Sequence, residues 1–156
     1  MNTMILADTV RQSLDEHVRP GSGAQTAHVA GPGFSCELDL ERADDLACAL
    51  LRLRVVPAQP PTASLRDRSQ TLAGRVTGLL EPLQVIEVDA GQGAAQLRSQ
   101  SPAARGDDRA YYELMLEGDG RATLRRYLGH ADAPRSPTPF TITRDALAKL
   151  ITDLVS

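Results

Sequence analysis

Residues 111–128 read YYELMLEGDGRATLRRYL, a stretch that predicts a β-hairpin. If residues 118–120 form its loop, with the last glycine in the left-handed conformation, the register of the two strands follows by counting. Leu114 then faces Leu124 across the hairpin. A two-residue loop at the same place would set a leucine against a charged residue, so the hydrophobic pattern selects the three-residue loop. The stretch therefore predicts paired antiparallel strands.

This register gives the hairpin one apolar and one polar face. The apolar face carries four residues that we expect to be buried: Leu114, Leu116, Ala122 and Leu124. The polar face combines aromatic and basic side chains. We predict it as the candidate interaction surface of the protein, formed by Tyr111, Tyr127, Arg121, Arg125 and Arg126. The simpler alternative is an ordinary solvated sheet face.

Sheets that bind single-stranded nucleic acid also combine aromatic and basic side chains. In the predicted register, however, Glu113 faces Arg125 and Glu117 faces Arg121, so we expect carboxylates to neutralise these arginines. The whole chain carries a net charge of −3, with acidic and basic residues spread over both halves. We therefore expect a protein partner or self-association, and no nucleic acid.

An amphipathic helix is predicted at the end of the chain, after a proline-rich loop at 129–139 and a short strand near Phe140. Thr143 suits the N-cap, and Ile142 before it can pack on Leu147 as a hydrophobic staple. The apolar residues recur at the spacing of one helical face: Leu147, Leu150, Ile151 and Leu154. That face must be buried against another part of the protein.

The first half of the chain predicts helix, strands and helix. An amphipathic helix is expected up to Pro20, followed by short strands within 24–40. Residues 41–52 then have apolar residues at helical spacing, and we predict a second helix there. The alternation of leucine or valine with arginine at 51–55 would also suit a strand.

A proline-rich linker near residues 57–62 divides the chain into two halves. Ser64 begins a capping box and predicts a helix after the linker. A hairpin closed by a two-residue loop at 91–92 then pairs Ile86 with Leu97. Together with the first hairpin it forms a four-strand meander in the C-terminal half.

These elements predict an α+β fold in which an antiparallel sheet packs against amphipathic helices. At 156 residues the chain is about one domain, and we expect a single domain over residues 1–156. Both halves run helix, strands, helix, which suggests a pseudo-repeat, although we find no residue-level self-similarity. The five aromatic residues leave a core of small side chains, which dimerisation would help to stabilise.

Residue types that perform catalysis or bind metals are not found at useful spacings. The three histidines and two cysteines never fall at the spacing of a metal site. Cys36 alternates with apolar neighbours, so we expect it in the core. The glycines around Gly91 lack the third glycine and the helix of a dinucleotide-binding fingerprint. We therefore predict no catalytic residue, no metal and no cofactor, and we favour a non-catalytic role over an enzymatic one.

The sequence is typical of a cytoplasmic protein. Residues 1–19 lack the basic segment and apolar run of a signal peptide. A membrane span needs about 20 apolar residues, and no apolar run in the sequence is close to that length. Two cysteines do not make a disulfide framework. Sixteen of the 17 basic residues are arginine, which together with abundant alanine, glycine and proline indicates a GC-rich, bacterial genome.

Our preferred hypothesis is a chaperone-like, non-catalytic module that holds a protein partner and forms a homodimer. In its size, mild acidity, alternation of helices and antiparallel strands, and terminal amphipathic helix, the chain resembles the small chaperones of bacterial type III secretion. The alternative is a small-ligand-binding or enzymatic domain. Its pocket would lie between the meander and the C-terminal helix.

Overall fold

The computed structural model describes residues 2–21 and 23–156. Within these residues the chain forms three helices and ten strands. In chain order they are α1 (Thr3–His17), β1 (Gln25–Gly31), β2 (Phe34–Ala43), β3 (Ala47–Pro57), α2 (Leu65–Arg75), β4 (Leu83–Asp89), β5 (Ala94–Ser99), β6 (Ala103–Arg105), β7 (Asp108–Glu117), β8 (Ala122–Gly129), β9 (Ser136–Pro137), β10 (Phe140–Thr143) and α3 (Arg144–Val155). Across the described part of the chain, no helix is long and apolar enough to cross a membrane.

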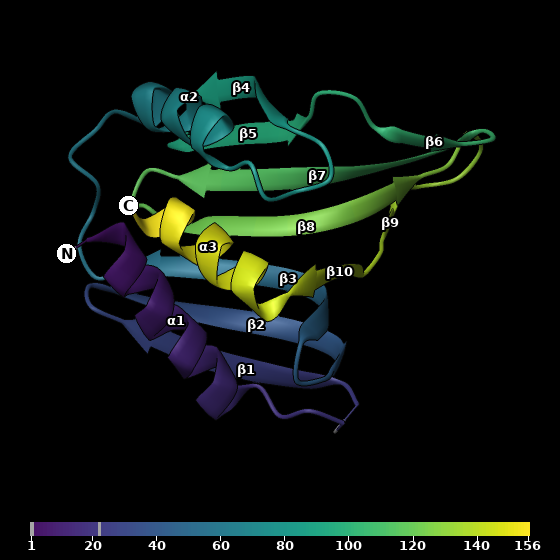
Figure 1. The fold of residues 1–156 in the computed structure, drawn as a ribbon. Coiled ribbons are helices and arrows are strands. Elements are labelled where there is room, and N and C mark those ends of the chain that lie inside the picture. The colour runs from purple at the N-terminus through teal and green to yellow at the C-terminus, as the bar shows by residue number, and fades with distance from the viewer. Residues whose placement is uncertain (1, 22) are drawn as a thin grey trace.

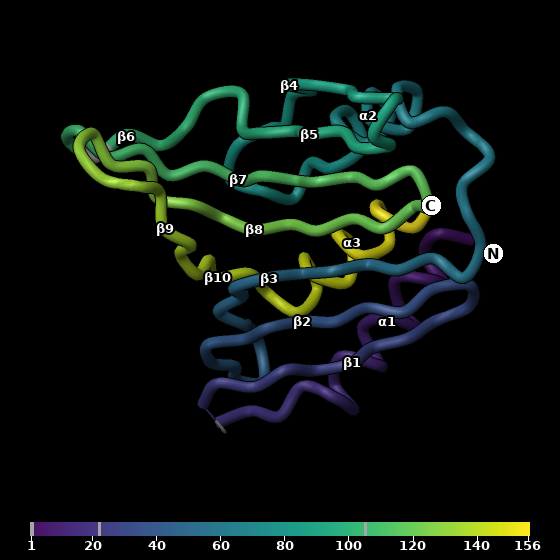
Figure 2. Tube along the Cα trace, turned by 180° about the vertical axis from the view of Figure 1, so that it is seen from behind, coloured from purple at the N-terminus to yellow at the C-terminus, as the bar shows by residue number. Residues whose placement is uncertain are grey.

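All the strands belong to one antiparallel sheet, in the order β1-β2-β3-β8-β7-β5-β4, with β10 beside β3, β6 beside β7 and β9 beside β8. The helices cover one face, here called the inner face, with α1 and α3 over the β1–β3 side and α2 over the β4–β5 side (Figure 1). Seen from behind, the outer face is free of helices (Figure 2). The α+β class with an antiparallel sheet is confirmed. The sheet is larger than expected, and the four-strand meander and the pseudo-repeat stay predictions.

The predicted register of the hairpin from 111 to 128 is confirmed, because Leu114 pairs with Leu124 and Tyr111 pairs with Tyr127. Gly120 has a φ of 101° and donates its backbone N–H to the carbonyl of Glu117 at 2.9 Å. The apolar side chains that were expected on one face are all buried: Leu114, Leu116, Ala122 and Leu124. The pairing of β3 with β8 joins this hairpin to the first half of the chain in the same sheet.

The three helices begin after polar residues, and the N-caps predicted at Ser64 and Thr143 are confirmed. Asn2, Ser64 and Thr143 each accept a hydrogen bond from a backbone N–H of the first turn, at 2.8, 3.1 and 3.1 Å. These bonds satisfy donors that would otherwise lack a partner inside the helix. The apolar face of α3 is buried as predicted, through Leu147, Leu150, Ile151 and Leu154.

The predicted helix at 41–52 is wrong. β2 continues to Ala43, and β3 runs from Ala47, after a turn in which the Asp44 side chain accepts the backbone N–H of Ala47 at 2.7 Å. The β2–β3 register shifts between Asp39 and Arg42, so that Leu51 lies in a β-bulge. A bulge adds one residue to one strand, which breaks the period of two and produces a spacing that resembles a helix.

A second bulge alters the expected pairing of β4 with β5. Val88 pairs with Ala95, as predicted, but Leu97 pairs with Val85 instead of Ile86. The register shift between Val85 and Glu87 leaves the Ile86 side chain on the surface, where it is 48% exposed.

Candidate protein-interaction surface

Four of the five predicted surface residues lie on or beside the outer face, within the β7–β8 hairpin. The rings of Tyr111 and Tyr127 lie side by side with their centroids 6.1 Å apart. Arg121, next to the turn, pairs with Glu117 at 3.1 Å, as expected from the register. Arg125 lies two positions before Tyr127 in β8, so strand alternation places both side chains on the same face. These residues lie close together because the two strands pair in the predicted register.

The prediction that Arg126 shares this surface is wrong. Successive side chains of a strand point to opposite faces, so Arg125 and Arg126 cannot lie on one face. Arg126 is only 6% exposed and lies on the inner face. Its guanidinium contacts the Tyr112 ring, with 4.2 Å to the centroid, and pairs with Glu81 at 3.0 Å. Arg126 therefore has a structural role in the core.

Two arginines that sequence analysis missed complete the surface. Arg135 lies over the Tyr127 ring at 3.8 Å, donates a hydrogen bond to the Tyr111 hydroxyl at 3.3 Å, and pairs with Glu113. Arg98 lies 5.1 Å from the centroid of the Tyr111 ring and 3.5 Å from a Glu113 oxygen. We call the five residues joined by these contacts the tyrosine–arginine cluster: Tyr111, Tyr127, Arg98, Arg135 and Glu113. Their mutual contacts hold the aromatic rings in a fixed arrangement.

Glu113 lies at the centre of the tyrosine–arginine cluster. The sequence analysis expected it to pair with Arg125 across the hairpin, but its ion pairs are with Arg98 and Arg135. It is buried between Arg98 and Arg135, and its hydrogen bond raises the pKa of Arg135. Among the described residues, Arg125 forms no ion pair. Its guanidinium is therefore available to an acidic group. The Arg98–Glu113 contact follows from the pairing of β5 with β7, whereas no sequence signal indicates Arg135.

A buried polar network fixes the segment between α2 and β4. Ser99 donates a hydrogen bond to Glu81 at 3.0 Å and accepts one from the backbone N–H of Tyr112 at 2.8 Å. The Tyr112 hydroxyl accepts the backbone N–H of Leu80 at 3.4 Å, and burial raises the pKa of Tyr112. The backbone at Leu80 is thus anchored, yet its side chain is 80% exposed. This network holds an apolar side chain out in solvent.

β4 forms one edge of the sheet, since it pairs only with β5 among the described strands. Ile86 on this strand and Leu80 just before it are both large, apolar and exposed. We call these two residues the β4-edge patch. The first half of the strand, Leu83 to Ile86, carries no charged side chain. Edge strands are usually protected by charges, proline or a covering segment. In β4 the charges are confined to Glu87 and Asp89 and a proline precedes the strand, so its first half is the part open to pairing.

A cavity of about 630 Å³ lies between α2, the C-terminal end of α3 and the proline-rich segment 57–63. Gly120 of the β7–β8 turn contributes to its wall. The alternative hypothesis placed a pocket between the meander and the C-terminal helix, whereas this cavity is lined mainly by α2 and segment 57–63. A small-ligand function stays a prediction. In the described part of the chain, no group of three or more metal-ligating side chains gathers. Cys36 is buried in the core, and burial raises its pKa to about 12.

Comparison with known proteins gives no relative: no protein-family model, no curated protein and no solved structure matches the chain. The functional interpretation therefore rests on the surfaces and packing of this protein itself.

Proposed function

We propose that this protein is a chaperone-like, non-catalytic module that forms a homodimer in the bacterial cytoplasm and holds a protein partner. The observation that carries the proposal is the β4-edge patch on a strand that pairs on one side only among the described strands. An open strand edge offers backbone donors and acceptors to a second strand. Exposed apolar side chains beside it favour association because contact removes them from water.

A second copy of the chain suits this edge. Antiparallel pairing of β4 with β4 of another copy makes an interface with twofold symmetry, the commonest symmetry of dimers. If the axis passes near Val85, Glu87 of each copy faces Leu83 of the other, so the acidic ends of the strands do not meet. The two Ile86 side chains lie close to the axis. The sheets of both copies would then be continuous.

Size-exclusion chromatography with light scattering tests the dimer. We expect the wild type to have twice the mass of the chain and Ile86→Lys to have the mass of one chain. Ile5→Lys is the matched control, because Ile5 is an exposed isoleucine on α1, far along the chain from the β4 edge. A monomeric wild type, or the same loss of mass in both variants, contradicts the proposal.

Dimerisation through β4 leaves the outer face free for the protein partner. The tyrosine–arginine cluster supplies tyrosine and arginine side chains, the residue types that dominate binding energy at protein interfaces. Its contacts also hold these side chains in place before binding, which lowers the entropic cost of association. Arg125, which lacks an ion pair, adds a site for an acidic group of the partner.

Affinity capture from the native organism tests partner binding. We expect the wild type to recover a specific protein, and the double variant Tyr111→Ser/Tyr127→Ser to lose it while remaining folded. Arg66→Ser is the control, since Arg66 is exposed on α2 on the other side of the sheet. Repeated recovery of no protein, or equal recovery by the double variant, counts against this role of the outer face.

A further inference from the structure

We propose that the cavity between α2, α3 and the segment 57–63 binds a small amphiphilic organic acid, with an apolar body and one carboxylate. This site is separate from the β4 edge and from the outer face. It does not depend on the homodimer or on the protein partner.

The cavity has the size and the lining of a ligand site. Its volume, about 630 Å³, lies within the range of about 300–1,000 Å³ that is typical of small-molecule pockets. Side chains from separate segments converge on it, among them Val55, Pro57 and Pro61 on one side and Leu72 and Leu154 on the other. This apolar wall suits a hydrocarbon body.

The charged side chains of the lining are all arginines. Arg68 and Arg75 of α2 contribute to the wall, and no aspartate or glutamate of the described residues does. Thr62 and Thr71 add hydroxyl groups that can bind a carboxylate. These side chains favour an anion over a cation.

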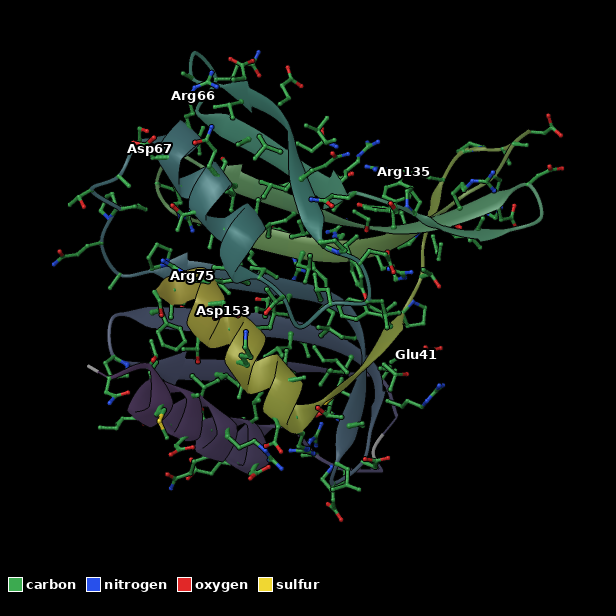
Figure 3. The ribbon with its side chains drawn as sticks, turned by 45° about the horizontal axis from the view of Figure 1, so that its top comes forward. Glu41, Arg66, Asp67, Arg75, Arg135 and Asp153 are labelled. Atoms are coloured by element: carbon green, nitrogen blue, oxygen red, sulfur yellow. The ribbon has the colours of Figure 1, made fainter. Side chains whose placement is uncertain are left out.

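Arg75 already uses its guanidinium within the fold. Its Nη1 donates to the backbone carbonyl of Asp153 at 3.4 Å and to that of Ser156. Figure 3 shows Arg75 close to the C-terminal turn of α3, near Asp153. These bonds tie α2 to α3 and shape the cavity, so Arg75 is a structural part of the wall.

Arg68 is the arginine with unused binding capacity. Its Nη2 donates to the Gly120 carbonyl at 2.8 Å, whereas its Nη1 is buried without a hydrogen-bond partner. The carboxylate of Asp119 pairs with Arg121 at 2.8 Å, and it acts on Arg68 only through longer-range electrostatics. Burial lowers the pKa of Arg68, as expected for a guanidinium that has lost water and gained no carboxylate. Because Arg68 lines the cavity and forms no ion pair with the described residues, its guanidinium attracts a ligand carboxylate.

The wall next to Arg68 is already formed. A Cβ at Gly120 would lie 2.5 Å from Cγ of Pro57 and 2.7 Å from Cδ of Pro61, so the two prolines pack directly on the turn. Because Gly120 also has a φ of 101°, only glycine suits this position. Because this wall needs no rearrangement, binding has a lower entropic cost. A small acid that makes few contacts can then bind.

Isothermal titration with decanoate, below the concentration at which it forms micelles, tests the site. We expect saturable binding of one decanoate per chain and at least tenfold weaker binding of decan-1-ol, which has no charge. Arg68→Gln should weaken decanoate binding by about 10- to 100-fold, the effect of one charge-assisted hydrogen bond. Arg66→Gln should bind like the wild type, because Arg66 lies at the exposed start of α2, outside the cavity wall (Figure 3).

A second variant keeps the test decisive if Arg68→Gln fails to fold. Thr71 is an exposed residue of α2 that lines the cavity, and Thr71→Phe should fill it and abolish binding. Absence of saturable binding to the wild type overturns the proposal. Equal loss in Arg66→Gln and Arg68→Gln, undiminished binding by Thr71→Phe, or equal affinity for decan-1-ol overturns it as well.

Discussion

The two edges of the sheet differ in how they meet solvent. A helix packs against each edge strand, α1 on β1 and α2 on β4. At the β1 edge the exposed side chains are small or polar, such as Thr26 and His28. At the β4 edge, Leu80 and Ile86 are exposed. Both edges belong to the same sheet and have unpaired backbone groups. This difference is why we propose that a second copy binds at β4 and not at β1, since exposed apolar side chains favour association.

The polar anchors behind the two edges differ as well. On the β1 side, the buried guanidinium of Arg144 donates to the backbone carbonyls of Leu14, Val18 and Asp44, at 3.1, 3.2 and 2.8 Å. This residue joins α1, the β2–β3 turn and α3 inside the fold. On the β4 side, Glu81 pairs with Arg126, and the side chain of Leu80 just before it is exposed to solvent. Arg144 therefore joins elements inside the core, whereas Glu81 fixes the backbone next to the exposed Leu80.

The largest expected effect is on the β1 side. Arg144→Met should lower the free energy of unfolding by about 3–5 kcal/mol, because it leaves several buried carbonyls without a donor. Urea denaturation measures this loss. Arg42→Met, at an exposed position of β2, is the control and should change little. Equal stability of the two variants would show that Arg144 is not an anchor.

The anchor on the β4 side should be weaker but should also affect the dimer. Glu81→Gln removes the charge that pairs with Arg126, and we expect a loss of about 2–3 kcal/mol. Because the Leu80 backbone then loses part of its support, the dimer should also dissociate more readily, as seen by light scattering over a dilution series. If stability falls with no change in dissociation, the network does not position Leu80.

The core beneath the β1 side should make stability fall at alkaline pH. Cys36 has an ordinary pKa of 9.0 that burial raises to about 12. Between these values the unfolded chain loses the thiol proton and the folded chain keeps it, so each pH unit costs about 1.4 kcal/mol. Comparison of urea denaturation for the wild type and Cys36→Ala at pH 8 and pH 10 isolates this effect. Parallel changes in both proteins would exclude it.

The smallest expected effect on folding is at the β4-edge patch. Ile86→Thr should change the free energy of unfolding of the separated chain by no more than about 0.5 kcal/mol, since the side chain is largely outside the core. The same change should weaken the dimer. A large loss of stability in dilute solution would show that Ile86 serves the fold and not association.

Local features of this fold could be predicted from the sequence. The hairpin register follows from the glycines and the leucine pattern around Leu114, and the N-caps at Ser64 and Thr143 follow from single polar residues. The bulges at Leu51 and Ile86 could not, because they depend on which strand lies alongside. For the same reason the prediction gave a helix at 41–52 and a buried pairing for Ile86.

The candidate site was predictable only within one hairpin. Tyr111 and Tyr127 were found by counting, but Arg135 reaches them from a loop with no periodic pattern. Arg126 was misplaced because residue type was weighed above strand alternation. Glu81 and the cavity near Arg68 arise from contacts between segments far apart in the chain, for which a single sequence gives no signal.

Backbone hydrogen exchange at two protein concentrations tests most directly whether β4 is the contact edge. We predict that outward backbone amides of β4 are protected at high concentration and exchange faster on dilution, as the dimer dissociates. Amides of the β1 edge should exchange at the same rate under both conditions. Exchange in β4 that is independent of concentration, or protection that appears in β1 instead, would contradict the account.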